Sequence, residues 1–330
     1  MFYKRFSPGH VLYVSRRTYL RKVAVPHFEG ITGEKTFVLE TTNPGIMLQE
    51  FLPFVLTTER FHEYAISNSR GSVNPYLNWG ELAAYKFNLP PLGEQQRIAN
   101  LLWALENCDQ GVWQVAGRGI EVAESIRSKF MGHYGRPVAA SDAFDIIIGR
   151  QRAPKHEKGD HLVPYLRSAN VTSTGVSLDD VKSMNFTPTE QAKFALEPGD
   201  VLVSEGSASA TAVGMPAVWK GEMEGTVCFQ NTLLRYRAIE GVTLPGFVEH
   251  WCRWAFETGR FLRAASGTNI HHIGSGGAAA MEVRLPTIEE QEAFLGRVNS
   301  ADRVTADALR EAAKLGNLRK ALFADVFGGR

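Results

Sequence analysis

One short signature occurs twice in this chain of 330 residues, and it constrains the fold more than any other feature. Residues 89–96 read Leu-Pro-Pro-Leu-Gly-Glu-Gln-Gln, and residues 285–292 read Leu-Pro-Thr-Ile-Glu-Glu-Gln-Glu. In each copy a proline stops an extended run, and acidic and glutamine residues then open a long helical pattern. The repetition predicts an internal duplication, so we expect two related units instead of one large domain.

Other short matches keep the same order in both halves. Ahead of each signature, residues 8–12 (Pro-Gly-His-Val-Leu) correspond to residues 198–202 (Pro-Gly-Asp-Val-Leu), and Arg60-Phe61 corresponds to Arg260-Phe261. Counted from these matches, the second unit begins near Arg136, whereas Met1 corresponds to about Gln191. We therefore expect the first unit to lack a counterpart of residues 136–190. This absence predicts core surface left exposed at residues 11–14 and 37–39.

A long amphipathic helix is predicted after each signature. Apolar residues recur at spacings of three and four, as in a coiled-coil seam, with Gly119 as a break. Each helix would have roughly 35 residues and a length of about 50 Å. Because its apolar stripe must be buried, we expect the helices to pair as an antiparallel coiled coil; the alternative is that each packs on its own domain. The expected seam residues are Ile98, Leu101, Leu105, Cys108, Val112, Val115, Val122, Ile126 and Phe130 in the first helix, and Phe294, Val298, Ala301, Val304, Ala308, Ala312, Leu315, Leu318, Leu322 and Val326 in the second.

The remaining segments mix short strand-like runs with short helices, which indicates an α+β fold. The predicted organisation is a pseudo-two-fold internal repeat. Residues 1–91 form a first globular domain that is incomplete at its N-terminus, and residues 92–135 form the first long helix. Residues 136–286 form the second globular domain, and residues 287–330 form the second long helix.

Bulk composition excludes several classes of protein. With 44% hydrophobic and 22% charged residues, the chain is typical of an ordinary soluble protein. No apolar stretch is long enough to span a membrane and the N-terminus has no signal-peptide pattern, so we expect a cytoplasmic protein without a membrane partner. Three cysteines without a CxxC pair support neither a disulfide framework nor a zinc site.

Two local clusters of basic residues stand against a net charge of only +1. Residues 1–28 carry six Lys and Arg residues with interleaved tyrosines and no acidic residue. A second cluster lies in residues 150–161, a loop that follows the strand-like run of residues 144–148. A nucleic-acid site in this chain must therefore depend on local charge. The alternative is that both clusters are solvated surface.

Several motifs, in their order along the chain, resemble the specificity subunit of a type I restriction–modification enzyme. The resembling segments are residues 64–82, 89–98, 163–178, 198–202 and 285–292. The resemblance implies two target-recognition domains, each followed by a long helix. It extends over nearly the whole chain, apart from the missing start of the first domain.

The resemblance also implies a division of labour. Each target-recognition domain would bind one half of a split, asymmetric sequence in double-stranded DNA, and the paired helices would set the gap and dock two modification (methyltransferase) subunits. S-adenosylmethionine would be bound by those partners, so no cofactor or metal is expected in this chain. A motor and nuclease subunit would complete the restriction form. The chain itself would catalyse nothing, in keeping with the lack of phosphate-loop, dinucleotide and nucleophile-elbow motifs.

Candidate DNA contacts follow from side-chain chemistry. Arg reads guanine, Asn and Gln read adenine, Ser and Thr read either, and Lys, Arg and backbone amides hold phosphates. The alternative for each Ser, Asn or Gly is a turn-forming role. The candidates in the first domain are Ser15, Arg16, Arg17, Tyr19, Lys22, Ser69, Arg70, Asn74 and Tyr76; those in the second are Arg150, Arg152, Lys155, Lys158, Ser204, Ser207, Ser209, Asn269, His271 and His272.

The incomplete first domain leaves several hypotheses open. The absent segment is encoded separately and binds in trans, or the chain reads only one half-site, or two chains self-associate to read a symmetric site. A truncated decoy that binds the modification subunit without directing it is a rival from another class. A methyltransferase or nuclease is a third class, which the absent cofactor motifs disfavour.

Overall fold

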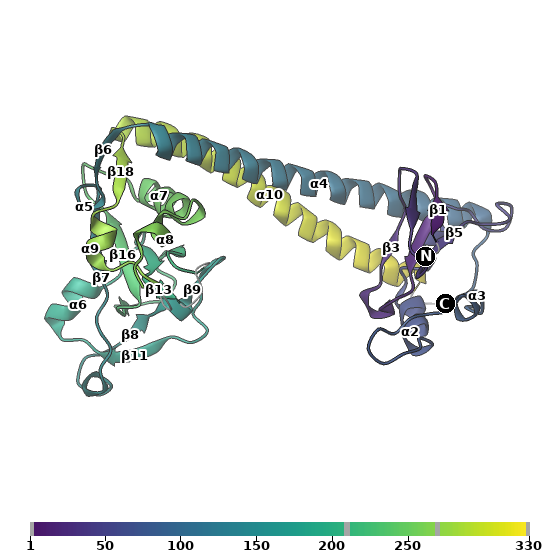
Figure 1. The fold of residues 1–330 in the computed structure, drawn as a ribbon, viewed down its shortest axis with the longest axis horizontal. Coiled ribbons are helices and arrows are strands. Elements are labelled where there is room, and N and C mark those ends of the chain that lie inside the picture. Colours follow the sequence, from purple (N-terminus) through teal and green to yellow (C-terminus); the bar gives the residue numbers. More distant parts are fainter. Residues whose placement is uncertain (1–2, 208–211, 268–270, 328–330) are drawn as a thin grey trace. The chain divides into compact units, whose positions relative to one another are not determined.

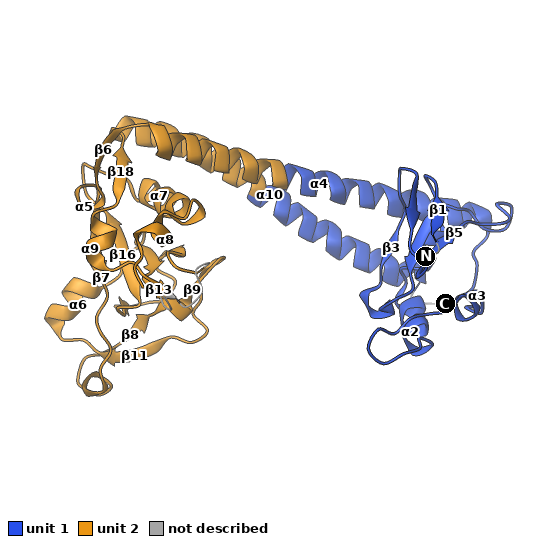
Figure 2. Ribbon diagram, in the orientation of Figure 1, with its two compact units in different colours: residues 1–116, 306–330 blue, residues 117–305 orange. Residues whose placement is uncertain are grey.

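The computed structural model describes residues 3–207, 212–267 and 271–327. The chain divides into two compact units (Figure 2): unit 1 comprises residues 1–116 and 306–330, and unit 2 comprises residues 117–305. Both long helices contribute to both units. Strands and helices are mixed in each unit, which confirms the predicted mixed fold with two long helices.

Unit 1 is built on a small antiparallel sheet in the order β3-β2-β5, with a separate β1-β4 pair (Figure 1). Buried residues of β2 and of the following helices form its core, among them Val11, Tyr13 and Phe61. Its elements are β1 (Lys4–Phe6), β2 (Val11–Val14), β3 (Val23–Ala24), β4 (Gly30–Thr32), β5 (Thr36–Leu39), α1 (Leu52–Val55), α2 (Glu59–Ser67) and α3 (Trp79–Ala83), with parts of α4 (Leu92–His133) and α10 (Ile288–Phe327).

Unit 2 has a larger antiparallel sheet in the order β14-β12-β16-β7, beside a β11-β8-β15 sheet and a β18-β6 pair. Trp251, Tyr236 and Phe144 are fully buried in its main core. Its elements are β6 (Arg136–Ala139), α5 (Ala140–Ala143), β7 (Phe144–Ile148), β8 (Leu162–Leu166), β9 (Val171–Thr172), β10 (Gly175–Val176), β11 (Lys182–Asn185), α6 (Pro188–Phe194), β12 (Val201–Ser204), β13 (Gly206–Ser207), β14 (Pro216–Val218), β15 (Cys228–Phe229), β16 (Leu233–Ala238), α7 (Pro245–Glu257), α8 (Arg260–Ala264), β17 (His271–His272), α9 (Ser275–Ala279) and β18 (Glu282–Leu285).

Three strands of the four-stranded sheet of unit 2 correspond to the three strands of the unit 1 sheet. In unit 1, β2 pairs with β3 on one side and β5 on the other, and Val11 lies opposite Leu39. In unit 2, β12 pairs with β14 and β16 in the same way, and Val201 lies opposite Tyr236. The internal repeat read from the sequence is therefore a repeat of the fold.

A buried glutamine in each signature explains why the signature is repeated. The Gln95 side chain accepts from the Leu48 N–H (2.9 Å) and donates to the carbonyl oxygens of Ile46 (2.9 Å) and Pro90 (2.8 Å). The Gln291 side chain accepts from the Leu244 N–H (2.9 Å) and donates to the carbonyl oxygens of Val242 (3.0 Å) and Pro286 (3.1 Å). Both glutamines are 0% exposed. Gln95 joins the first turn of α4 to the loop before α1, and Gln291 joins the first turn of α10 to the loop before α7.

Replacing either glutamine by leucine tests this role. Gln95→Leu and Gln291→Leu each remove a buried amide that bonds three backbone groups, so we expect a loss of about 1–3 kcal/mol in the free energy of unfolding. Urea denaturation followed by hydrogen exchange should show the loss in unit 1 for Gln95→Leu and in unit 2 for Gln291→Leu. Gln96→Leu, at an exposed position of the same turn, is the control and should change little. Equal effects of all three variants would contradict the assignment.

The two long helices run antiparallel in each unit. In unit 1, Glu106 of α4 pairs with Arg319 of α10 at 3.2 Å, and the earlier Ile98 packs in one cluster with the later Val326. In unit 2, the rings of Phe130 and Phe294 stack with centroids 4.3 Å apart. The helices have 42 and 40 residues, and no helix in the described ranges is apolar enough over a sufficient length to cross a membrane.

The predicted seam is only partly right. Ile98, Leu105, Phe130, Phe294, Val298, Ala308 and Ala312 are buried. Leu101, Cys108, Val115, Val122, Val304 and Leu318 are predicted in the seam but are exposed. Small residues replace them in the buried stripe of α4, namely Ala116, Gly119 and Ala123. A search for large apolar side chains overlooks a close-packed seam of this kind.

Gly119 is therefore part of the seam and not a break in it. A Cβ atom at Gly119 would overlap the side chain of Thr305, which lies on α10 within the same unit. Gly117 offers a matched control, because a Cβ atom there meets nothing within 4 Å.

We expect Gly119→Leu to destabilise unit 2 by about 1–3 kcal/mol, because the larger side chain forces the two helices apart. Gly117→Leu should be neutral, or stabilising by up to about 1 kcal/mol through its helix propensity. Thermal denaturation of both variants measures the difference. Equal stability of the two variants would show that α4 and α10 are not in close contact at Gly119.

Candidate nucleic-acid interface

Two loops of unit 1 join at one end of its sheet. Strand β2 ends where β5 begins, so residue 15 and residue 35 lie together, and the Ser15 N–H donates to the Lys35 carbonyl (2.8 Å). Arg16 and Arg70 each form a β-bridge with Tyr76, and the Leu77 N–H donates to the Ser15 carbonyl (3.0 Å). Residues 15–22 and 69–76, called here loop surface 1, thus form one continuous region.

Basic and aromatic side chains are concentrated on loop surface 1. The Arg17 Nε donates to Asn74 Oδ1 (2.7 Å), and the backbone of Arg17 is left-handed at φ 55°. The Arg70 guanidinium pairs with Glu81 at 2.6 Å. Arg16, Tyr19 and Lys22 are exposed to solvent. These groups have the chemistry for phosphate contacts and guanine recognition.

One basic residue of the N-terminal cluster is engaged within the protein. Arg21 makes a two-pronged contact with the Glu59 carboxylate (2.7 and 2.6 Å). Hydrogen bonding to Arg21 lowers the pKa of Glu59. The cluster that the sequence presents as continuous therefore has part of its charge neutralised by α2.

Unit 2 repeats the same loop junction. Gly206 and Ser266 each bridge to His272, as Arg16 and Arg70 bridge to Tyr76. The Ile273 N–H donates to the Glu205 carbonyl (2.9 Å), which matches the bond between Leu77 and Ser15. Residues 205–207, 266–267 and 271–272 are called here loop surface 2.

Loop surface 2 carries a different set of side chains. His272 is exposed and its Nδ1 lies 2.8 Å from the Glu205 carboxylate, while His271 is partly buried. Ser207 lies in β13, opposite His271. Ser209 and Asn269, both predicted as DNA contacts, lie outside the described residues. Among the described residues, no group of three or more His, Cys, Asp and Glu side chains is arranged to hold a metal ion.

The basic loop of residues 149–161 begins at the same end of the unit 2 sheet. The Asn231 N–H donates to the Arg150 carbonyl (3.0 Å), and the Glu205 N–H donates to the Thr232 carbonyl (2.9 Å). Arg152, Lys155 and Lys158 are exposed on this loop, and Arg152 pairs with Glu157 at 2.7 Å.

The structure adds residues that sequence reasoning missed. Lys35 places its Nζ 4.3 Å from the centre of the Tyr76 ring. Residues 230–232 lie between the two loops of unit 2, because Asn231 bonds the backbone of Arg150 and Thr232 bonds the backbone of Glu205. Lys35 directly precedes β5, and residues 230–232 directly precede β16. Their position at that end of the sheet is the signal that could have found them.

Three predicted contacts are withdrawn because their side chains are buried or are held inside the protein. Ser15 is 1% exposed and its hydroxyl donates to the Lys35 carbonyl (2.9 Å); Ser204 is 5% exposed. Arg150 is largely buried: its Nε lies 2.8 Å from Glu190, its Nη1 donates to the Asn185 carbonyl, and its guanidinium lies over the Phe186 ring. A side chain held in this way anchors the loop and cannot extend to a base.

We expect Arg150→Ala to cost about 1–3 kcal/mol of stability, because it removes the partner of Glu190 and of the Asn185 carbonyl. Arg152→Ala removes an exposed ion pair and should cost less than about 1 kcal/mol. Denaturation of both variants without DNA separates the two roles. Full stability of Arg150→Ala would restore Arg150 as a candidate DNA contact.

Comparisons with known proteins agree on one class. Residues 5–110 match the family model of the type I restriction modification DNA specificity domain. The specificity subunit of the type I restriction enzyme EcoKI from Escherichia coli (strain K12) is 22% identical over 175 residues. That match covers 50% of this chain and 37% of the EcoKI subunit, so the chain matches well under half of the relative's length.

Solved structures show the same fold over nearly the whole chain. The S subunit of a type I restriction–modification system from M. genitalium matches with a TM-score of 0.63 at 12% identity, covering 97% of this chain and 83% of that one. The HsdS subunit from Thermoanaerobacter tengcongensis matches with a TM-score of 0.51 at 18% identity, covering 98% and 82%. A chain from a type I system, described for complex assembly and conformational transition, matches with a TM-score of 0.58 at 17% identity, covering 97% and 82%.

The chain thus has the two-unit fold of the solved type I S subunits, and its residues 5–110 match the type I restriction modification DNA specificity domain.

Proposed function

We propose that this chain is the sequence-specific, non-catalytic DNA-recognition subunit of a type I restriction–modification complex. The observation that carries the proposal is the repeated loop junction, with Arg16, Arg70 and Tyr76 in unit 1 and Gly206, Ser266 and His272 in unit 2. Two similar surfaces with different side chains suit the reading of two different short sequences in double-stranded DNA. Because chromosomal DNA would be the ligand, the proposal implies a cytoplasmic protein.

The remaining predicted residues have assigned roles in this proposal. Exposed Arg, Lys and Tyr side chains of the loops contact phosphates and bases, and backbone amides of the junctions add phosphate contacts. The residues proposed to contact DNA are Arg16, Arg17, Tyr19, Lys22, Ser69, Arg70, Asn74 and Tyr76 with Lys35 in unit 1, and Arg152, Lys155, Lys158, Ser207, Ser209, Asn269, His271 and His272 in unit 2.

The long helices have two roles in the proposal. Their pairing fixes the number of unread base pairs between the two halves of the target, and their outer faces dock modification subunits, two per complex. Exposed apolar side chains of α4 support the docking role, since Leu101, Trp113 and Val115 are 44%, 55% and 47% exposed. Those subunits would bind S-adenosylmethionine and transfer the methyl group, and a motor and nuclease subunit would complete the restriction form. The domain boundaries proposed are residues 1–91 and 136–286 for recognition, with the helices between and after them.

A second candidate is a subunit that reads one half-site, as a monomer or a homodimer, or that acts as a decoy. The observation that favours it is confined to unit 1, where β5 is half-exposed while its counterpart β16 is largely buried. A unit 1 that lacks part of its core would bind DNA weakly.

DNA binding by the assembled complex tests the proposal. Arg16→Ala should weaken binding to the specific target by about 1–3 kcal/mol if Arg16 reads a base. Lys22→Ala should weaken specific and non-specific binding alike and reduce the slope of log K against log salt by about 1. Arg5→Ala, at an exposed position of β1 outside loop surface 1, is the matched control. If Arg16→Ala and Lys22→Ala bind like Arg5→Ala, loop surface 1 does not contact DNA, and the half-site reading is favoured.

A further inference from the structure

A buried carboxylate belongs to loop surface 2. Glu205 directly follows β12 and is only 8% exposed. One of its carboxylate oxygens lies 2.8 Å from Nδ1 of His272, and the other accepts from the Gly274 N–H at 3.3 Å. Burial of a carboxylate is costly unless the group is hydrogen-bonded, so these two contacts compensate for it. Through them Glu205 holds the His272 ring and the backbone that follows it.

Gly206 leaves the space in which the His272 ring lies. The two residues lie opposite each other where β13 pairs with β17. A Cβ atom at Gly206 would lie 2.5 Å from Nδ1 and 2.8 Å from Cε1 of the ring. A side chain at this position would therefore displace the imidazole from Glu205.

The matching junction of unit 1 is formed without these two residues. The position of Glu205 is occupied there by Ser15, whose hydroxyl donates to the Lys35 carbonyl (2.9 Å). The position of Gly206 is occupied by Arg16. The backbone bridges of the junction thus require neither a carboxylate nor a glycine. In unit 2 both residues serve the side chain that lies against them.

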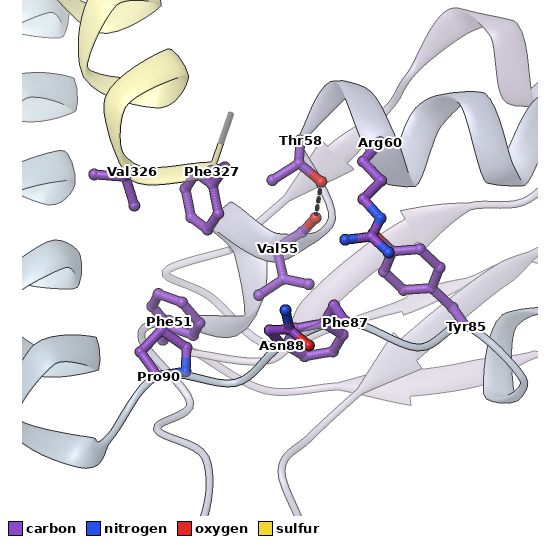
Figure 3. A pocket seen from close by; sticks show the side chains of 10 residues that line it. All are labelled: Phe51, Val55, Thr58, Arg60, Tyr85, Phe87, Asn88, Pro90, Val326 and Phe327. Atoms are coloured by element: carbon purple, nitrogen blue, oxygen red, sulfur yellow. Dashed lines mark hydrogen bonds between the residues drawn. The ribbon is translucent and has the colours of Figure 1, made fainter. Parts of the chain in front are cut away.

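The hollow beside α1 in unit 1 is of another kind. Figure 3 shows Phe51, Val55 and Phe87 facing a common space beside Val326 and Phe327. Its volume of about 40 Å³ leaves room for about one water molecule. This hollow is therefore a packing feature where α10 meets α1, and a base or another ligand of that size does not fit into it.

The contact with Glu205 decides which ring nitrogen of His272 a ligand meets. A carboxylate accepts hydrogen bonds, so Nδ1 keeps its proton in the neutral ring and in the charged ring alike. Nε2 is then the nitrogen that remains for a ligand, and the His272 side chain is 55% exposed. A ring that is already fixed in orientation loses little conformational freedom on binding.

We propose that Glu205 is a positioning residue that makes His272 specificity-determining in unit 2. Glu205 and Gly206 hold the imidazole so that Nε2 bonds the edge of one base in the major groove of double-stranded DNA. This inference rests on the proposed DNA recognition and deepens it, because it names the residues that fix one reading side chain. Loss of the fixed ring relaxes the choice of base at one position of the target.

The state of the ring can be measured in the full-length chain without DNA. With isotope-labelled histidine, the nitrogen chemical shifts of His272 report which ring nitrogen carries a proton, and His272→Ala identifies its signals. We expect a protonated Nδ1 in the wild-type chain. Glu205→Gln keeps the shape of the side chain but offers only one acceptor oxygen, so the ring should lose its fixed Nδ1 proton and show both tautomers. Glu224→Gln removes an exposed carboxylate and is the matched control, which should leave the ring unchanged.

The choice of base is measured with the assembled complex. Methylated motifs are mapped in DNA from cells that express each variant with a modification subunit, and His272→Ala marks the position that the ring reads. We expect Glu205→Gln and Gly206→Ala to relax this same position, with the preference for the correct base falling by about tenfold. Gly206→Ala displaces the ring without a change of charge. Glu224→Gln should keep the wild-type motif.

Several results would overturn the inference while the proposed function stands. In the full-length chain these are an unprotonated Nδ1 in the wild type, or an Nδ1 proton that Glu205→Gln leaves in place. In the complex they are a motif that His272→Ala does not change, a position that either Glu205→Gln or Gly206→Ala keeps, or equal relaxation by Glu224→Gln. A wild-type complex that methylates no motif would contradict the proposed function itself, and this inference with it.

Discussion

A single buried amide connects each long helix to the globular part that precedes it. Gln95 and Gln291 are fully buried, and each bonds one backbone N–H and two backbone carbonyl groups. A buried amide of this kind costs several kcal/mol if its partners are lost, so it fixes the position of the first helical turn. The direction in which α4 and α10 leave their units, and thus the pairing of the helices within each unit, depends on these three bonds.

The same backbone plan carries different chemistry in the two units. In unit 1, aromatic rings pack where α1 meets the long helices: the centroid of the Phe54 ring lies 5.2 Å from that of Trp103 and 6.4 Å from that of Phe323. At the corresponding junction, His250 of unit 2 contacts Asn299 at 3.3 Å and Arg127 at 3.4 Å. Burial lowers the pKa of His250, which favours its neutral form at this junction. Conserved geometry with exchanged side chains is also the pattern of the two loop surfaces.

The sequence predicted the features that depend on local rules. Proline followed by Glu-Gln marks the helix starts, and periodic apolar residues mark the long helices, so the repeat and the mixed fold could be read directly. The exact seam could not, because Ala116, Gly119 and Ala123 are buried by close approach of the helices and not by their own hydrophobicity. Arg150 looked like a DNA contact because Glu190 and Asn185, which hold it, are distant in sequence. Which loops meet depends on strand pairing, so the junctions of residues 16, 70 and 76 appeared only in the structure.

We propose that the two loop surfaces of this chain read two parts of a DNA target. The most direct measurement is a map of methylated bases in DNA from cells that express this chain with a modification subunit alone. We expect one split motif, in which loop substitutions in unit 1 relax one half and loop substitutions in unit 2 relax the other. A symmetric motif that responds only to unit 2, or a complex that forms and methylates no motif, would contradict it.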